Sequence, residues 1–329
     1  MKFGIYRHES SIGNSIEHIY ALSFYLLNNS IDPSKIQVYV QHSWQKDFVC
    51  CIDGIKEENV KLFSKPVTLA DAEEYSDIHM PCVYGGPGNF SKTFDSNWDY
   101  LNKQDIKRST LKFNSDKYKN KFDLPKNSIV LFCREQTQWH SEQKREELEE
   151  HRFVKKPQVF HELAHYYKTL GFKVVRIGDQ YQQKLPGNYE ECEYGEKYED
   201  ANIIDLTKFV DYSGRPLWDM QDYLYVLQNC KLFISCDAGI WPMAAAMKKN
   251  MVFCNAAPCR PDGSDLEFIR VPDGTQILKE KKPKYSHWLP QETTRILLKK
   301  VLKVPGRGVY IFDTPIQSIK EKSRELINV

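Results

Sequence analysis

The sequence predicts an α/β protein whose two parallel-sheet domains follow one another along the chain and face a central cleft. Its 329 residues suit two domains of about 100–200 residues each. Short apolar segments alternate with segments of helical periodicity, which is typical of βαβ units and parallel sheets. A polar, lysine-rich stretch at residues 112–126 separates two such series, and we interpret it as the linker.

The first domain is expected over residues 1–120, and its apolar segments are short. A glycine-rich stretch at 84–89 is typical of a loop. The predicted elements are a strand at 2–7, a helix at 16–27 and further strands at 36–40 and 60–63.

The second domain, expected over residues 126–305, repeats the alternation more clearly. One helix has a proline at its start and Gly171 at its end, as helix capping favours. The tail at 306–329 is expected to be helical. The predicted strands are 128–133, 173–177, 203–206, 231–235 and 251–254, and the predicted helices are 157–170, 217–229, 241–247, 291–302 and 316–327.

Composition argues against several classes of function. Lys and Arg number 46 against 44 Asp and Glu, so the chain lacks the basic surplus of a dedicated nucleic-acid binder. The nine cysteines form no CxxC pair, and we interpret them as buried reduced thiols rather than a disulfide framework. With no signal-like start and no run of about 18 apolar residues, the protein is expected to be cytoplasmic, without a membrane span. Peripheral contact with a membrane surface is compatible with these features.

A literal His-Glu-x-x-His pattern lies at residues 161–165 on one predicted helix. In zinc proteases the two histidines of this motif bind the metal and the glutamate acts as the base. At about 100° per residue, the apolar residues of this helix form one stripe, and His161, Glu162 and His165 fall opposite it. We therefore interpret the motif as part of the solvent-exposed polar face of a helix that covers a sheet. A zinc metalloprotease is the remote alternative.

The stretch from Cys230 to Ala246 carries the strongest functional pattern. A buried strand is followed by Asp237, Ala238 and Gly239, and then by a helix rich in small residues. Ligands of open α/β sheets bind beyond the carboxyl ends of strands, where free backbone N–H groups suit a phosphate. A tight strand-to-helix turn without a ligand is the alternative.

Residues 237–246 resemble the D-[ST]-G-x-x-H-x-A-x-A signature of the heptosyltransferases, glycosyltransferase family 9. The order of strands and helices over residues 128–258 is also similar to that family. The resemblance implies a GT-B fold, in which two Rossmann-like domains face a central cleft. It implies a nucleotide sugar bound by the C-terminal domain, an acceptor bound by the N-terminal domain, and C-terminal helices that return to the first domain.

Within this resemblance, the donor is expected to contact residues that follow strands of the second domain. Arg134 comes directly after one strand and resembles an arginine that fucosyltransferase-like GT-B enzymes place on the donor phosphate. A surface salt bridge is the alternative for this residue. The other donor-binding candidates are Arg176, Gly178, Asp179, Asp237, Ala238, Gly239 and Trp241, with Tyr212 as a second aromatic candidate.

The sequence departs from the family at two functional positions. The signature histidine is absent, with Met243 nearby, and the first loop carries Asn14 where heptosyltransferases have a catalytic aspartate. Because an amide cannot accept the proton, we expect Glu9 to be the catalytic base, with His8 as the second candidate. Gly13 and Asn14 are expected to face the acceptor.

These features predict a glycosyltransferase that moves a sugar from a nucleotide-sugar donor to a glycan, lipid-linked or protein acceptor. We expect inversion in a single displacement, with no metal or other cofactor and no nucleic-acid partner. A nucleotide-sugar epimerase or hydrolase of the same fold is the alternative.

Overall fold

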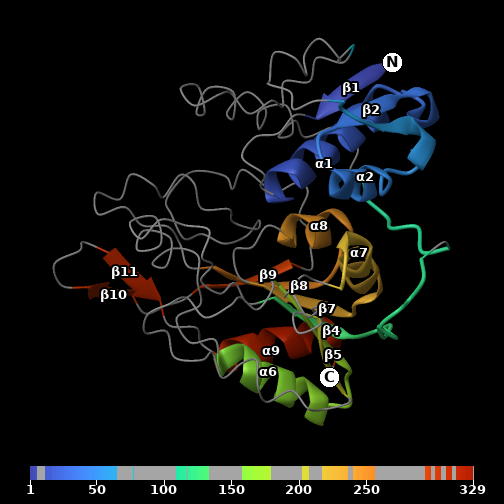
Figure 1. Cartoon of the computed structure of the whole chain (residues 1–329). Helices are drawn as coiled ribbons and strands as arrows, with labels where there is room; N and C mark the ends of the chain where they lie inside the picture. The colour runs from blue at the N-terminus through green and yellow to red at the C-terminus, as the bar shows by residue number, and fades with distance from the viewer. Residues whose placement is uncertain are drawn as a thin grey trace, which may run out of the picture.

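Two parallel sheets, each flanked by helices, form the body of the protein in the computed structural model (Figure 1). The structure describes residues 1–5, 12–64, 77, 109–116, 118–132, 158–178, 202–206, 217–235, 240–255, 293–297, 301–304, 309–312 and 316–328.

The N-terminal sheet has three parallel strands in the order β1-β2-β3. Its predicted helix is present and extends further toward the N-terminus than the periodicity indicated. A second, seven-residue helix was not predicted from the sequence. The elements are β1 (Lys2–Ile5), α1 (Ile12–Asn28), β2 (Gln37–Val40), α2 (Ser43–Val49) and β3 (Val60–Leu62), with 3₁₀ turns at Pro33–Lys35 and Glu57–Asn59.

The C-terminal sheet has six parallel strands in the order β6-β5-β4-β7-β8-β9. The chain enters in the middle at β4, proceeds outward to β6, returns to β7 beside β4, and then proceeds outward in the other direction. This reversal makes a doubly wound sheet with a topological switch point between β4 and β7. The strands are β4 (Ile129–Phe132), β5 (Val174–Ile177), β6 (Ile203–Asp205), β7 (Leu232–Ser235), β8 (Met251–Asn255) and β9 (Thr293–Leu297).

Both faces of this sheet are covered by helices, so its central strands β4 and β7 are buried along their whole length and consist almost entirely of apolar residues. In β4, Val130 and Phe132 belong to the cluster of the inner face, beneath α7 (Met220–Asn229) and α8 (Trp241–Ala246). Residues 129 and 131 belong to the cluster of the outer face, beneath α6 (Gln158–Thr169) and α9 (Ile316–Ile327). Figure 1 shows these two helix layers on opposite sides of the strands.

The inner face connects the two units through a continuous apolar core. Helix α1 packs on α8, α2 contacts α7, and one buried cluster contains residues of both units. The Lys248 Nζ atom lies 2.6 Å from the Tyr20 hydroxyl oxygen across this contact. The first residue of the linker and the residue before it are bonded to opposite units. The Leu111 N–H donates to the Ala246 carbonyl (3.0 Å), and the Lys112 N–H donates to the Cys51 carbonyl (2.8 Å).

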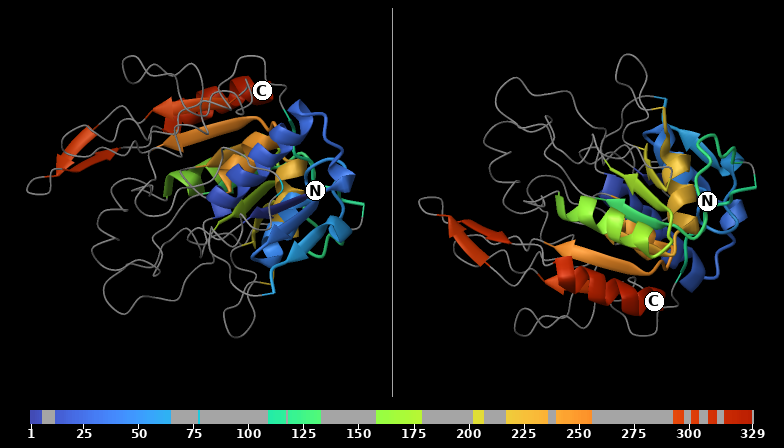
Figure 2. Two further views of the ribbon diagram at one scale, coloured as in Figure 1. Left: turned by 90° about the horizontal axis from the view of Figure 1, so that it is seen from above. Right: turned by 90° about the horizontal axis from the view of Figure 1, so that it is seen from below.

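The C-terminal tail differs from its prediction in two respects. The segment 291–302 was expected to be a helix, but it contributes β9 and then β10 (Val301–Val304), which pairs antiparallel with β11 (Val309–Phe312). This prediction was wrong because Thr293, Thr294 and Ile296 are β-branched and the edge of β8 accepts a further parallel strand. Figure 2 shows the β10–β11 hairpin projecting beyond the end of β9.

The helix predicted at 316–327 is confirmed as α9, but its expected return to the first domain is wrong. Ile319 and Ile327 are buried against α6 in the outer-face cluster. The Tyr167 hydroxyl of α6 donates to the Ser323 hydroxyl of α9. The Leu326 carbonyl accepts from the Asn250 side chain at 3.2 Å. The apolar stripe of α9 is thus used to cover its own sheet (Figure 2).

Three described cysteines, Cys50, Cys51 and Cys230, are unpaired thiols, as expected from the sequence. Burial raises the pKa of Cys50 to about 11 and that of Cys230 to about 12, so neither is a thiolate at neutral pH. Within the parts of the chain that the structure describes, no helix is long and apolar enough to cross a membrane.

Candidate functional site

The switch point of the six-stranded sheet is where an open α/β fold places its ligand. The last residues of its two strands, Phe132 of β4 and Ser235 of β7, are register partners at the carboxyl edge. Arg134 follows the first of these by two positions in the sequence, and Asp237 follows the second by two. The predicted donor residues Arg134, Asp237, Ala238 and Gly239 themselves lie outside the described residues, as does Tyr212.

The small residues after β7 contribute to the contact between the two units. Ala244 and Ala246 are buried in the inner-face cluster, where α8 packs on α1. Small side chains here allow the two helices to approach closely. Trp241 begins α8, and its side chain is not among those described.

Arg176 is bound to an acidic partner inside the sheet. Its Nη1 atom lies 2.9 Å from the Oδ2 atom of Asp205, its register partner on β6, and the two side chains are 3% and 2% exposed. Arg176 alternates with Val175 and Ile177 along β5 and therefore faces the outer helix layer. Its predicted role as a donor cation stays a prediction, and that role requires the guanidinium to share or leave this ion pair.

The carboxyl end of β5 is held by a tyrosine that the sequence reasoning did not single out. The Gly178 N–H donates to the Tyr223 hydroxyl (3.1 Å), and that hydroxyl donates to the Gly178 carbonyl. The Tyr223 ring stacks on Trp218, with ring centroids 4.4 Å apart and planes 14° from parallel. Both aromatic residues come from the start of α7, so this helix fixes the backbone immediately before Asp179, which is outside the described residues.

Asp219 and Asp222 form the capped start of α7, within the segment 217–229 that was predicted to be helical. Asp219 is the N-cap, and its carboxylate accepts from the backbone N–H groups of Gln221 and Asp222. The buried Asp222 carboxylate accepts in turn from the Asp219 N–H at 2.8 Å, which completes a capping box.

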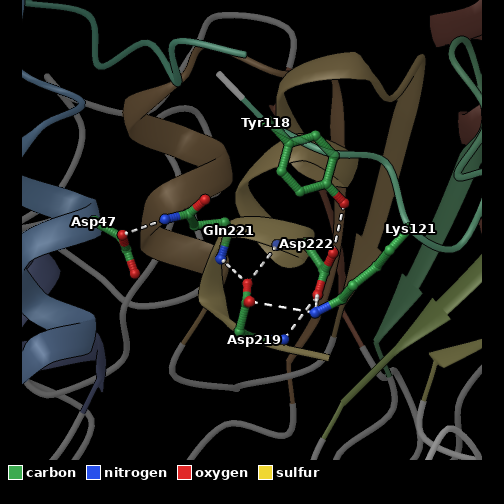
Figure 3. Close-up of polar contacts among 6 residues, drawn as sticks. All are labelled: Asp47, Tyr118, Lys121, Asp219, Gln221 and Asp222. Carbon is green, nitrogen blue, oxygen red and sulfur yellow. Dashed lines mark hydrogen bonds and ion pairs between the residues drawn. The ribbon is translucent and has the colours of Figure 1, made fainter. Parts of the chain in front are cut away.

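Two side chains of the linker bind to this helix start (Figure 3). The Tyr118 hydroxyl donates to Asp222 at 2.5 Å, and the Lys121 ammonium lies 3.2 Å from Asp222 and 3.3 Å from Asp219. Burial and then the hydrogen bond to Asp222 raise the pKa of Tyr118 well above its ordinary value. Partial burial lowers the pKa of Lys121, but its contacts with Asp222 and Asp219 outweigh this, so the pKa is raised overall.

A contact to the N-terminal unit continues this cluster. The Gln221 side chain donates to the Asp47 carboxylate of α2 at 3.0 Å (Figure 3). Burial raises the pKa of Asp47, although the Gln221 hydrogen bond acts in the opposite direction. The first turn of α7 therefore contacts the linker on one side and the N-terminal unit on the other.

The N-terminal candidates follow β1 in the sequence or belong to the start of α1. Glu9 and His8 fall in the segment between β1 and α1, outside the described residues, and so does the glycine-rich stretch at 84–89. Gly13 and Asn14 form the first turn of α1, with side chains that are not described. Their predicted roles stay predictions.

The His-Glu-x-x-His helix has the amphipathic arrangement predicted for it. Phe160, Leu163, Ala164 and Tyr167 are buried against the sheet, whereas Glu162 is exposed. Within the described part of the chain, no group of three His, Cys, Asp or Glu side chains is gathered as the catalytic zinc site of a protease would require.

Comparison with known proteins identifies the fold through solved structures. No protein-family model matches the sequence, and no curated protein matches it. The E. coli ADP-heptose LPS heptosyltransferase II is 13% identical, with 99% of this chain and 98% of that chain aligned at a TM-score of 0.54. A glycosyl transferase family 9 protein of Veillonella parvula is 11% identical, with 99% and 96% aligned at a TM-score of 0.51.

The fold is therefore that of the heptosyltransferase-type GT-B glycosyltransferases, and the predicted α/β class is confirmed. The dodecameric iron-containing heptosyltransferase TibC of enterotoxigenic E. coli is similar over a shorter part, at a TM-score of 0.44. This chain spans 58% of the length of that protein.

Proposed function

We propose that this chain is a glycosyltransferase that transfers a sugar from a nucleotide-sugar donor to a hydroxyl acceptor. The observation that carries the proposal is the doubly wound sheet with its switch point between β4 and β7. Candidate phosphate-binding residues follow both strands in the sequence, and the fold is that of nucleotide-sugar enzymes. The donor then belongs to the domain at 126–305 and the acceptor to the domain at 1–120.

Donor binding starts at the paired strand ends. Since two residues span at most about 7 Å, Arg134 and Asp237 begin within short reach of the Phe132–Ser235 pair. The Arg134 guanidinium suits a diphosphate oxygen and stabilises the departing nucleotide, because its planar fork carries a permanent charge. The Gly239 backbone allows close approach, and Asp179, next to the tyrosine-held Gly178, suits a ribose or sugar hydroxyl.

Transfer is proposed to occur in one inverting displacement without a metal ion. The acceptor oxygen forms a bond to the anomeric carbon as the bond from that carbon to the diphosphate breaks. Glu9 takes the acceptor proton, and His8 is the second candidate. Both residues belong to the six-residue connection between the carboxyl end of β1 and the start of α1. Gly13 and Asn14 follow in the first turn of α1.

A nucleotide panel tests the donor half of this proposal. Unfolding midpoints are measured with ADP, UDP, GDP and CMP, because a ligand bound only by the folded state raises the midpoint. One nucleotide is expected to raise it, and Arg134→Ala is expected to abolish most of that shift. Absence of any shift with the wild-type chain would contradict the proposal.

The catalytic half is tested with the matching nucleotide sugar and an acceptor panel. Glu9→Gln is expected to abolish transfer while it preserves the nucleotide-induced shift, and EDTA is expected to leave transfer unchanged. Full transfer by Glu9→Gln would assign the base to His8 or another residue. Conversion of the donor without any acceptor would instead indicate the epimerase or hydrolase alternative.

A further inference from the structure

Two histidines on α6 point their ring nitrogens at one another. The Nε2 atoms of His161 and His165 are 3.1 Å apart, and the ring planes meet at 71°. The residues are one helical turn apart, so this convergence is built into the helix and needs no loop to form. Both histidines are half-buried, and the Nδ1 atom of His161 is fully buried.

The separation of the nitrogens matches the bite of a transition-metal ion. Two nitrogens that each lie about 2.0–2.1 Å from one zinc ion are about 3.3–3.4 Å apart at the tetrahedral angle and about 2.9 Å apart at a right angle. The observed 3.1 Å lies between these values. A metal therefore fits between the two Nε2 atoms with adjustments of a few tenths of an ångström.

We propose that His161 and His165 form a two-histidine chelate for a divalent transition-metal ion on the outer helix layer. Imidazole nitrogen suits Zn²⁺, Ni²⁺ and Cu²⁺, with Cu²⁺ bound most tightly, whereas Mg²⁺ and Ca²⁺ prefer oxygen ligands. Water completes the coordination shell. Metal binding requires an available lone pair on both Nε2 atoms, so a proton carried by either of them moves to an Nδ1 atom or to water.

The position of this site separates it from protease chemistry and from the proposed transferase site. Zinc proteases hold their ion with three protein ligands, but among the described residues no third His, Cys, Asp or Glu side chain joins this pair, and Glu162 is exposed. Helix α6 covers the outer face of the sheet, whereas the two units meet on the inner face (Figure 1). The ion is accordingly expected to stabilise α6 and to take no part in sugar transfer.

Calorimetric titration of the chelator-treated full chain with ZnCl₂, NiCl₂, CuCl₂ and MgCl₂ tests the proposal. One strong site per chain is expected for the three transition metals, tightest for Cu²⁺, and none for Mg²⁺. His161→Gln and His165→Gln are each expected to lower the affinity at least about tenfold, since a ligand is removed. The matched control Glu162→Gln, in the same helix turn, is expected to bind like the wild type.

Thermal unfolding supplies a second readout. Zn²⁺ is expected to raise the midpoint of the wild type and of Glu162→Gln but not of the double variant His161→Gln/His165→Gln. Equal binding by all variants would overturn the proposal, and absent binding would show that the pair shares only a hydrogen bond. Loss of binding in Glu162→Gln alone would assign the metal to a different ligand set. Nucleotide-induced shifts in the double variant test the proposed function separately.

Discussion

The two faces of the six-stranded sheet are covered in different ways. On the outer face, α6 and α9 belong to the same unit as the sheet and are joined by the Tyr167–Ser323 hydrogen bond. On the inner face, α7 and α8 cover the sheet and also contact the other unit, where α8 packs on α1 and α7 contacts α2. Described polar contacts such as Lys248–Tyr20 cross between the units on this side. The outer face therefore stabilises one unit, whereas the inner face also determines how the two units fit together.

The largest effects are expected from the buried ion pair of the outer face. Arg176→Leu and Asp205→Leu should each lower the free energy of unfolding by about 3–5 kcal/mol, because the remaining charge is buried without its partner. The double variant should recover most of this loss. Urea unfolding of the three variants checks the expectation, and a double variant less stable than either single one would contradict it.

On the inner face, Asp222→Asn should cost about 2 kcal/mol. The amide removes the charge that Tyr118 and Lys121 share and keeps one acceptor for the capping box. Glu57→Gln, which breaks the exposed pair with Lys46, is the control and should change stability by less than about 0.5 kcal/mol. Equal losses in the two variants would mean that the linker contact contributes no more than a surface ion pair.

Tyr223→Phe and Tyr167→Phe form a matched pair, one from each face. The buried Tyr167 hydroxyl bonds to α9 and the buried Tyr223 hydroxyl bonds to the carboxyl end of β5, so the loss of either should cost about 1 kcal/mol. If the donor binds at the carboxyl edge, only Tyr223→Phe should also weaken nucleotide binding, because Gly178 lies at that edge. Equal nucleotide affinities in the two variants would show that Tyr223 makes no contribution to nucleotide binding.

The smallest effect is expected from Asp47→Asn at the contact with Gln221. Burial raises the pKa of Asp47 in the folded state, so folding favours its protonated form. Its contribution to stability is therefore lost as the pH rises from the acid range through this pKa, and the ionised form is unfavourable at pH 7. The variant should be more stable than the wild type at pH 7 by about 0.5 kcal/mol and equal to it at acid pH. A lower stability at pH 7 would contradict this sign.

Local patterns along the sequence predicted the regular elements of the second unit well. The apolar runs of β4, β5 and β7 are where parallel strands were expected, and the cap of α6 at Gly171 has the left-handed conformation, with φ of 83°. Parallel strands that are buried on both faces form nearly continuous apolar runs, which can be recognised in the sequence without knowledge of the neighbouring strands.

Features that depend on distant partners were not predictable in the same way. The amphipathic stripe of α9 predicts that the helix covers an apolar surface but not which sheet provides it. Tyr223 reads as one more apolar residue of α7, and its bond to Gly178 joins positions 45 apart in the sequence. Asp222 lies in a segment that was predicted to be helical, yet its contacts with Tyr118 and Lys121 come from the linker.

The linker bonds of Leu111 and Lys112 have a consequence for how separation of the two units can be observed. These neighbouring amides donate to opposite units, one to Ala246 and the other to Cys51. A rotation that parts the units must release at least one of the two protons to solvent. The hydrogen-exchange rates of these two amides therefore report on the separation. The amide that exchanges faster identifies the unit from which the chain detaches first.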